Sequence, residues 1–198
     1  MPNIVTARVR ICGMRPAFFH SFSRHSIPLE RQERAGTAGN DPTEWKKTVQ
    51  ATDDRQLYVK ASQVFATIRD GARYTKKGRG TIQKDVVATL LVVSPERILL
   101  DRYLWDKELD ESPPEDPSLP TYLDVRGVRN PSTKARNVRY RVAISPGWEV
   151  EFVIQWDCTI ISTEQIQAAT IDGGRMCGLL NGRAIGMGRF EVTEFETI

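Results

Sequence analysis

Alternating apolar and polar positions recur along the chain. Residues 5–11 alternate in this way, and so do residues 149–156, which follow the turn at Pro146-Gly147. A last alternating segment begins at Phe190. A period of two is typical of a strand with one buried face. The three segments therefore predict strands whose apolar side chains turn towards a common core.

Two other segments have features of helices. Apolar residues recur at helical spacing from about Ala61 to Tyr74, which predicts an amphipathic helix. Further along, Ser162 and Gln165 have the spacing of a capping box. A second, shorter helix is therefore expected to begin at this point and to end before Gly173.

The middle of the chain contributes further strands. Residues 85–93 are almost wholly apolar and rich in β-branched side chains, which predicts a central strand, and residues 96–104 are expected to pair with it. Residues 125–144 predict a β-hairpin with turn chemistry at 130–132. The order is strand, helix, two strands, hairpin, strand, helix, glycine-rich loop and strand, which is the mixed order of an α+β fold.

The length of 198 residues suits a single domain, 1–198, that carries insertions. Three insertions are expected: a polar loop at about 20–47, an acidic and proline-rich loop at 106–120, and the hairpin at 125–144. The acidic loop cannot bury apolar surface, so it is expected to lie outside the core. Hydrophobic residues make up 40% of the chain, which is enough for a sizeable core.

Cysteine usage and hydropathy favour the cytoplasm. Cys12, Cys158 and Cys177 are odd in number and widely spaced, so they indicate neither a disulfide framework nor a zinc site. No stretch approaches the ~20 apolar residues of a membrane span, and the N-terminus lacks an apolar signal core. We expect a cytoplasmic protein with reduced thiols, without a membrane anchor, metal or cofactor.

The net charge is only +3, so the distribution of charge is more informative than the total. Between Val125 and Trp148 there are six basic residues and no acid: Arg126, Arg129, Lys134, Arg136, Arg139 and Arg141. Like charges at this density repel one another unless a polyanion neutralises them. Arginine also offers planar forks for phosphates and flat surfaces for bases. The alternative is a solvated hairpin that pairs with the acidic loop at 106–120.

Two further clusters combine basic residues with glycines. The first lies at the end of the predicted helix and contains Arg69, Arg73, Lys76, Lys77, Arg79 and Lys84, with Gly78 and Gly80. The second contains Gly178, Gly182, Gly186 and Gly188, with Arg183 and Arg189. Glycines allow backbone N–H groups to approach a phosphate. The alternatives are cations that complement a helix dipole and a tight connection with a bulge. The second cluster follows a helix and precedes a strand, which excludes dinucleotide and P-loop sites.

Residues 178–192, GLLNGRAIGMGRFEV, resemble the C-terminal glycine-rich loop and strand of the RAMP superfamily, specifically the backbone subunits of CRISPR effector complexes. Residues 57–69 resemble the stretch that leads into that family's first helix, although Lys60-Ala61 stand in place of its Pro-Gly. The turn at 146–147 and the strand after it match in the same order. The resemblance implies a ferredoxin-like, RRM-type palm with an antiparallel sheet, and a thumb at the basic hairpin that grips a guide strand. Relatives of this shape also occur as stand-alone proteins of phages and mobile elements.

Three functions follow as hypotheses. The first is a non-catalytic protein that binds single-stranded RNA or DNA, with RNA favoured, within a homo-oligomer or a multi-subunit ribonucleoprotein. The second is an endoribonuclease of the same fold, for which Asp41 is the candidate catalytic residue because some family members use an aspartate in this loop. The third is a protein-interaction subunit whose hairpin meets an acidic neighbour. His20 and His25 lie near Asp41, but their spacing fits no common metal-ligand pattern.

Aromatic residues supply candidates for contacts with bases. Phe18, Phe19 and Phe22 are interpreted mainly as core residues. Phe19 and Tyr74 are also candidates for stacking on bases, which bind aromatic rings through their flat faces.

Overall fold

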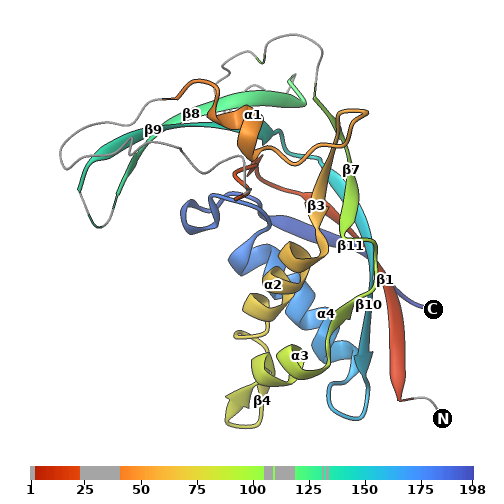
Figure 1. The fold of residues 1–198 in the computed structure, drawn as a ribbon. Coiled ribbons are helices and arrows are strands. Elements are labelled where there is room, and N and C mark those ends of the chain that lie inside the picture. Colours follow the sequence, from red (N-terminus) through yellow and green to blue (C-terminus); the bar gives the residue numbers. More distant parts are fainter. Residues whose placement is uncertain (1–2, 23–40, 105–108, 110–118, 131, 133) are drawn as a thin grey trace.

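The computed structural model describes residues 3–22, 41–104, 109, 119–130, 132 and 134–198. Its largest sheet is antiparallel, and Figure 1 shows it as one layer with helices against one side. In spatial order its strands are β11 (Phe190–Thr197), β1 (Ile4–Gly13), β10 (Glu149–Asp157), β7 (Arg97–Tyr103) and β3 (Gln56–Lys60), and β6 (Leu91–Val92) also pairs with β10. The expectation of an α+β fold with an antiparallel sheet is confirmed.

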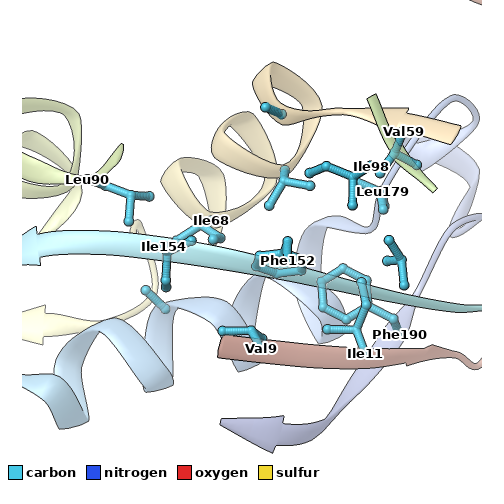
Figure 2. Packing of buried hydrophobic residues seen from close by; sticks show 14 of the residues in the cluster. Val9, Ile11, Val59, Ile68, Leu90, Ile98, Phe152, Ile154, Leu179 and Phe190 are labelled. Atoms are coloured by element: carbon cyan, nitrogen blue, oxygen red, sulfur yellow. The ribbon is translucent and has the colours of Figure 1, made fainter. Parts of the chain in front are cut away.

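The alternating segments of the sequence form the centre of this sheet. β1 and β10 pair along almost their whole length, with Val9 opposite Phe152. Figure 2 shows apolar side chains of both strands on the side of the sheet that faces Ile68. Phe190 of β11 is buried beside them. The predicted strands at the start, after residue 147 and at the end of the chain are therefore confirmed.

Two helices cover the inner face of the sheet: α2 (Ala61–Gly71) and α4 (Thr163–Asp172). α4 begins at the predicted capping box, in which the Ser162 hydroxyl accepts from the Gln165 backbone N–H at 3.3 Å. α2 ends three residues before the expected Tyr74. At Gly71 an added Cβ would lie 2.3 Å from the carbonyl oxygen of Ala169, so the glycine permits close packing of the two helices.

Residues 85–93 do not form the predicted strand. Most of them belong to α3 (Gln83–Thr89), and only residues 91–92 are extended, as β6. Ile82, Val86 and Leu90 are buried four residues apart, whereas Val87 is exposed. Burial along one helical stripe overrides the strand preference of β-branched residues. β7 accordingly pairs with β10 and with β3, a strand that the sequence pattern did not reveal.

The predicted basic hairpin is present and is longer than expected. It consists of β8 (Thr121–Arg129) and β9 (Arg136–Ile144), and β2 (Ala17–Phe18) pairs with β9 to complete a small sheet. Figure 1 shows this hairpin projecting away from the helices, with α1 (Glu44–Thr48) against it. A second, much shorter hairpin, β4 (Lys76–Lys77) and β5 (Gly80–Thr81), lies at the opposite end of the molecule.

After α4 the chain makes a π-helical turn at Gly173–Cys177 and a 3-10 turn at Arg183–Ile185 before β11 begins. Most of the predicted polar and acidic loops, residues 23–40 and 105–118 apart from 109, lies outside the described residues. No helix within the described ranges has the length and hydrophobicity needed to cross a membrane.

Candidate nucleic-acid interface

The base of the β8–β9 hairpin contains a buried ion pair. Asp124 and Arg141 face each other across the two strands, and Arg141 Nη2 donates to Asp124 Oδ2 at 3.1 Å. The other carboxylate oxygen of Asp124 accepts from Arg126 Nε at 2.6 Å. Burial lowers the pKa of Arg141, while the nearby Asp124 raises it. One carboxylate thus compensates two arginines at this point.

An aromatic ring and the glycine loop complete this arrangement. The guanidinium carbons of Arg126 and Arg141 lie 5.1 and 4.9 Å from the centroid of the Phe18 ring, which is completely buried. Such cation–π contacts favour a charge held over a ring face. Asn181 of the glycine loop accepts from Arg141 Nη1 at 2.9 Å. The hairpin is therefore fixed to the rest of the protein through Arg141.

A third hairpin arginine is engaged by α1. Arg139 Nη1 donates to Glu44 Oε1 at 2.6 Å, and the other oxygen of Glu44 accepts from the Tyr140 backbone N–H at 3.2 Å. His20 lies close to these charges, and its burial lowers its pKa. The interpretation of the hairpin as a run of cations without acids is therefore wrong for its base, because Asp124 and Glu44 come from outside the segment that was counted.

The tip of the hairpin is different. Arg129 and Arg136 are directly opposite each other in the register, and both are exposed. Within the residues that the structure describes, neither makes an ion pair. Lys134 lies in the turn with a φ of +61°, and its N–H donates to the Asn130 carbonyl at 3.0 Å. The predicted binding residues Arg129, Lys134 and Arg136 thus lie at a basic tip. Arg126, Arg139 and Arg141 form ion pairs at the base of the hairpin.

A second group of arginines meets at Asp70, near the end of α2. Asp70 forms ion pairs with Arg69 at 2.9 Å, with Arg73 at 3.4 Å and with Arg183 at 3.2 Å. We call these four residues the Asp70 cluster. Three guanidinium groups share one carboxylate, so two positive charges remain without an acid in the described part of the chain. The tertiary structure thereby joins the helix-end cluster to the glycine loop.

The glycine loop links this cluster to the hairpin base, because Arg183 reaches Asp70 while Asn181 reaches Arg141. An added Cβ at Gly188 would lie 1.9 Å from the Leu179 carbonyl oxygen, and one at Gly182 would lie 2.9 Å from the Phe18 ring. Both glycines are therefore required by packing. This agrees with the alternative interpretation of the glycine cluster as a tight connection between elements. An added Cβ at Gly186 meets nothing within 4 Å, although its φ is +79°.

The remaining basic residues of the helix-end cluster divide into two kinds. Lys77 Nζ donates to Asp85 Oδ2 at 2.7 Å and to the Ile160 carbonyl at 2.8 Å, so it holds the β4–β5 hairpin against the protein. Lys76, Arg79 and Lys84 are exposed, and among the described residues none of the three has an ion pair. Lys77 therefore has a structural contact, and the other three lysine and arginine side chains face solvent.

Asp41, the candidate catalytic residue, forms hydrogen bonds at the start of α1. Its Oδ1 accepts from the Thr43 N–H at 3.0 Å and from the Thr43 hydroxyl at 2.7 Å, and Lys47 Nζ lies 3.4 Å from Oδ2. These hydrogen bonds lower the pKa of Asp41. No group of three potential metal ligands occurs in the described ranges, and His25 lies outside them.

The aromatic candidates differ in their exposure to solvent. Phe18 and Phe19 are buried in the core, as predicted, so the hypothesis that Phe19 stacks on a base is wrong. Phe22 is 77% exposed, which contradicts its assignment to the core. Tyr74 is half exposed, so the hypothesis that it stacks on a base stays open.

Sequence reasoning missed the residues that organise the basic ones: Asp124, Glu44, Asp70 and Asn181. Asp124 precedes the counted segment by one residue, so a count from the start of β8 would have included it. Asp70 lies between Arg69 and Arg73, so the spacing of these charges on one helix could have revealed two of its three ion pairs. Glu44 and Asn181 come from distant parts of the chain and left no signal near the arginines that they bind.

No protein-family model matches the sequence, and no curated protein matches it. A structural similarity does exist, to a chain in the "Cryo-EM structure of the Type III-B Cmr-beta bound to cognate target RNA". The TM-score is 0.52 at 12% sequence identity, and the match covers 98% of this chain and 61% of that chain. This protein therefore shares a fold with that chain and spans about three fifths of its length.

Proposed function

We propose that this protein is a non-catalytic, single-stranded RNA-binding subunit of a ribonucleoprotein related to CRISPR effector complexes. The observation that carries the proposal is the exposed pair of arginines, Arg129 and Arg136, at the tip of a projecting hairpin. Like charges directly opposite each other destabilise a strand pair. A phosphate backbone between them turns that repulsion into two charge-assisted contacts, and arginine forks suit phosphate oxygens.

The order of strands and helices supports a ferredoxin-like palm. β1, α2, β7, β10, α4 and β11 occur in this order along the chain, with other elements between them, and their order in the sheet is β11-β1-β10-β7. A strand, a helix, two strands, a helix and a strand are the elements expected of the split β-α-β fold, so this order supports the proposed palm. The β8–β9 hairpin enters between β7 and β10, where the RAMP resemblance implies a thumb. The similarity to a chain of an RNA-bound CRISPR complex favours RNA over DNA and a multi-subunit assembly.

The Asp70 cluster adds basic residues of the proposed palm to those of the proposed thumb. Its two uncompensated charges and those of the hairpin tip provide at least four sites of attraction for phosphates. Asp41, by contrast, is held by Thr43 and Lys47 in a helix-starting arrangement, which supports a structural role for this residue rather than catalysis.

The proposal is tested first by the salt dependence of binding. If about four phosphates are neutralised on a single strand, the logarithm of the binding constant plotted against that of the salt concentration should have a slope near −3. Fluorescence anisotropy with labelled single-stranded RNA measures this slope. A slope near zero, or no binding at low salt, contradicts the proposal.

The second test is the double variant Arg129→Glu/Arg136→Glu. It replaces one like-charge pair by another, so the free energy of unfolding should hardly change. The RNA affinity should fall by at least about 100-fold, because contacts to charged groups are worth about 1.5–3 kcal/mol each. Arg97→Glu, an exposed arginine of β7, is the matched control and should keep most of the affinity. Unchanged RNA binding together with a smaller apparent size in gel filtration would favour the protein-interaction function instead.

The absence of catalysis has its own test. Labelled single-stranded RNA incubated with the protein and magnesium should remain intact. Cleavage that disappears in Asp41→Ala would replace the proposal with the endoribonuclease hypothesis.

A further inference from the structure

An exposed aromatic side chain lies between the Asp70 cluster and the β4–β5 hairpin. Tyr74 directly follows Arg73, which pairs with Asp70, and Thr75 alone separates it from β4. Its backbone is ordered, because its N–H donates to the Gly71 carbonyl at 2.9 Å. Its side chain is nevertheless 52% exposed and belongs to neither buried apolar cluster. Tyr74 therefore lies outside the apolar core, with about half of its surface open to solvent.

The β4–β5 hairpin places two cations beside this ring in the chain. Lys77, bonded to Asp85 and Ile160, anchors one face of the hairpin. Neighbouring side chains on a strand point to opposite faces, so Lys76 is directed away from that anchor. Arg79 follows Gly78 in the two-residue turn, where Gly78 has a φ of +58°.

The helix dipole does not account for this combination. Cations near a helix C-terminus are favourable within the last turn, where Arg69 already lies. The turn of the hairpin is beyond that range, and an exposed tyrosine ring gains nothing from a dipole. Aromatic rings next to basic residues are instead the usual elements of a platform for single-stranded nucleic acid, with the ring under a base and the cations at the phosphates.

We infer that Tyr74 stacks on a base of the bound strand, and that Lys76 and Arg79 hold the phosphates beside that base. This inference rests on the proposed RNA-binding function and adds a base contact to it. The strand then runs from the thumb and the Asp70 cluster along the end of α2 to the β4–β5 hairpin. Stacking uses the flat face that every base has, so this site binds without a preference for sequence.

The experiment compares Tyr74→Ala, Tyr74→Phe and a matched control, Tyr103→Ala. Tyr103 is a tyrosine of nearly the same exposure, 53%, on β7. Each protein is titrated by fluorescence anisotropy with an oligoadenylate of about 20 nucleotides, several site sizes long, and with an abasic RNA of the same length. Tyr74→Ala should bind the oligoadenylate about 5- to 150-fold more weakly, the range of one base–aromatic stack. It should bind the abasic strand like the wild type, and Tyr74→Phe should bind both normally.

The outcomes separate this inference from the proposed function. Suppose that the wild type binds RNA with the expected salt dependence while Tyr74→Ala and Tyr103→Ala lose equally little RNA affinity. In that case the inference that Tyr74 stacks on a base is wrong, and the proposed function stands. An equal loss on both strands in Tyr74→Ala also overturns stacking, because the abasic strand has no base to stack. If the wild type binds neither strand, the proposed function fails and the inference fails with it. Charge reversal at Arg79 should weaken binding to both strands alike, since a phosphate contact does not need a base.

Discussion

The base and the tip of the β8–β9 hairpin contain the same kind of residue in opposite situations. At the base, Arg141 has a side chain only 7% exposed and is enclosed by Asp124, Asn181 and the Phe18 ring. At the tip, Arg129 and Arg136 face each other in solvent. The base arginines hold the hairpin in position, and the tip arginines are free to bind a polyanion.

This contrast shows that a count of cations does not measure a binding surface. A buried arginine must be paired, because an isolated charge costs several kcal/mol when it leaves water. An exposed arginine keeps its hydration and can exchange it for a phosphate. The variants below test whether the two ends of the hairpin differ in this way.

The largest effect is expected from Asp124→Asn. The variant keeps the shape of the side chain but leaves Arg141 and Arg126 without their shared carboxylate. Removal of one partner of a buried pair typically costs about 3–5 kcal/mol, so the midpoint of urea unfolding should fall sharply. Glu196→Gln, which breaks the half-exposed pair with Arg8, is the control and should cost at most about 1 kcal/mol. Equal losses in the two variants would show that the base is not a buried ion pair in solution.

The next largest effect concerns the glycine loop that holds the base. Gly188→Ala places a Cβ against the Leu179 carbonyl and should lower the free energy of unfolding by about 2–4 kcal/mol, from overpacking and left-handed backbone strain. Gly186→Ala meets open space and carries only the backbone strain, about 1–2 kcal/mol. Thermal melting of both variants measures the difference. If Gly186→Ala is the more damaging change, the packing role assigned to Gly188 is wrong.

The smallest effect on stability is expected from the single variant Arg136→Glu at the tip. It converts the facing pair with Arg129 into an ion pair across the strands, which should raise the free energy of unfolding by about 0.2–1 kcal/mol. RNA affinity should nevertheless fall, because one attractive charge becomes repulsive. Urea unfolding measures the expected gain in stability, and fluorescence anisotropy on the same sample measures the expected loss of RNA affinity. A loss of stability together with affinity would mean that the tip, like the base, is a structural element.

Much of the fold followed from local patterns. The alternation at 5–11 and 149–156, the capping box at Ser162 and the hairpin around 130–132 all correspond to elements of the structure. Residues 85–93 show the limit of this reasoning. A run of apolar β-branched residues fits a buried strand or a helix with one buried stripe, and packing of Val86 against the core decided for the helix.

The candidate site was predictable only in its residue types. The sequence by itself determined where arginines and glycines concentrate, because composition is local. Only the tertiary structure decided which arginines are compensated, since Glu44 reaches Arg139, and Asp70 reaches Arg183, across 95 and 113 positions of the chain. The strength of an ion pair depends on the distance between the charges and on their burial, and the spacing of residues along the chain determines neither quantity.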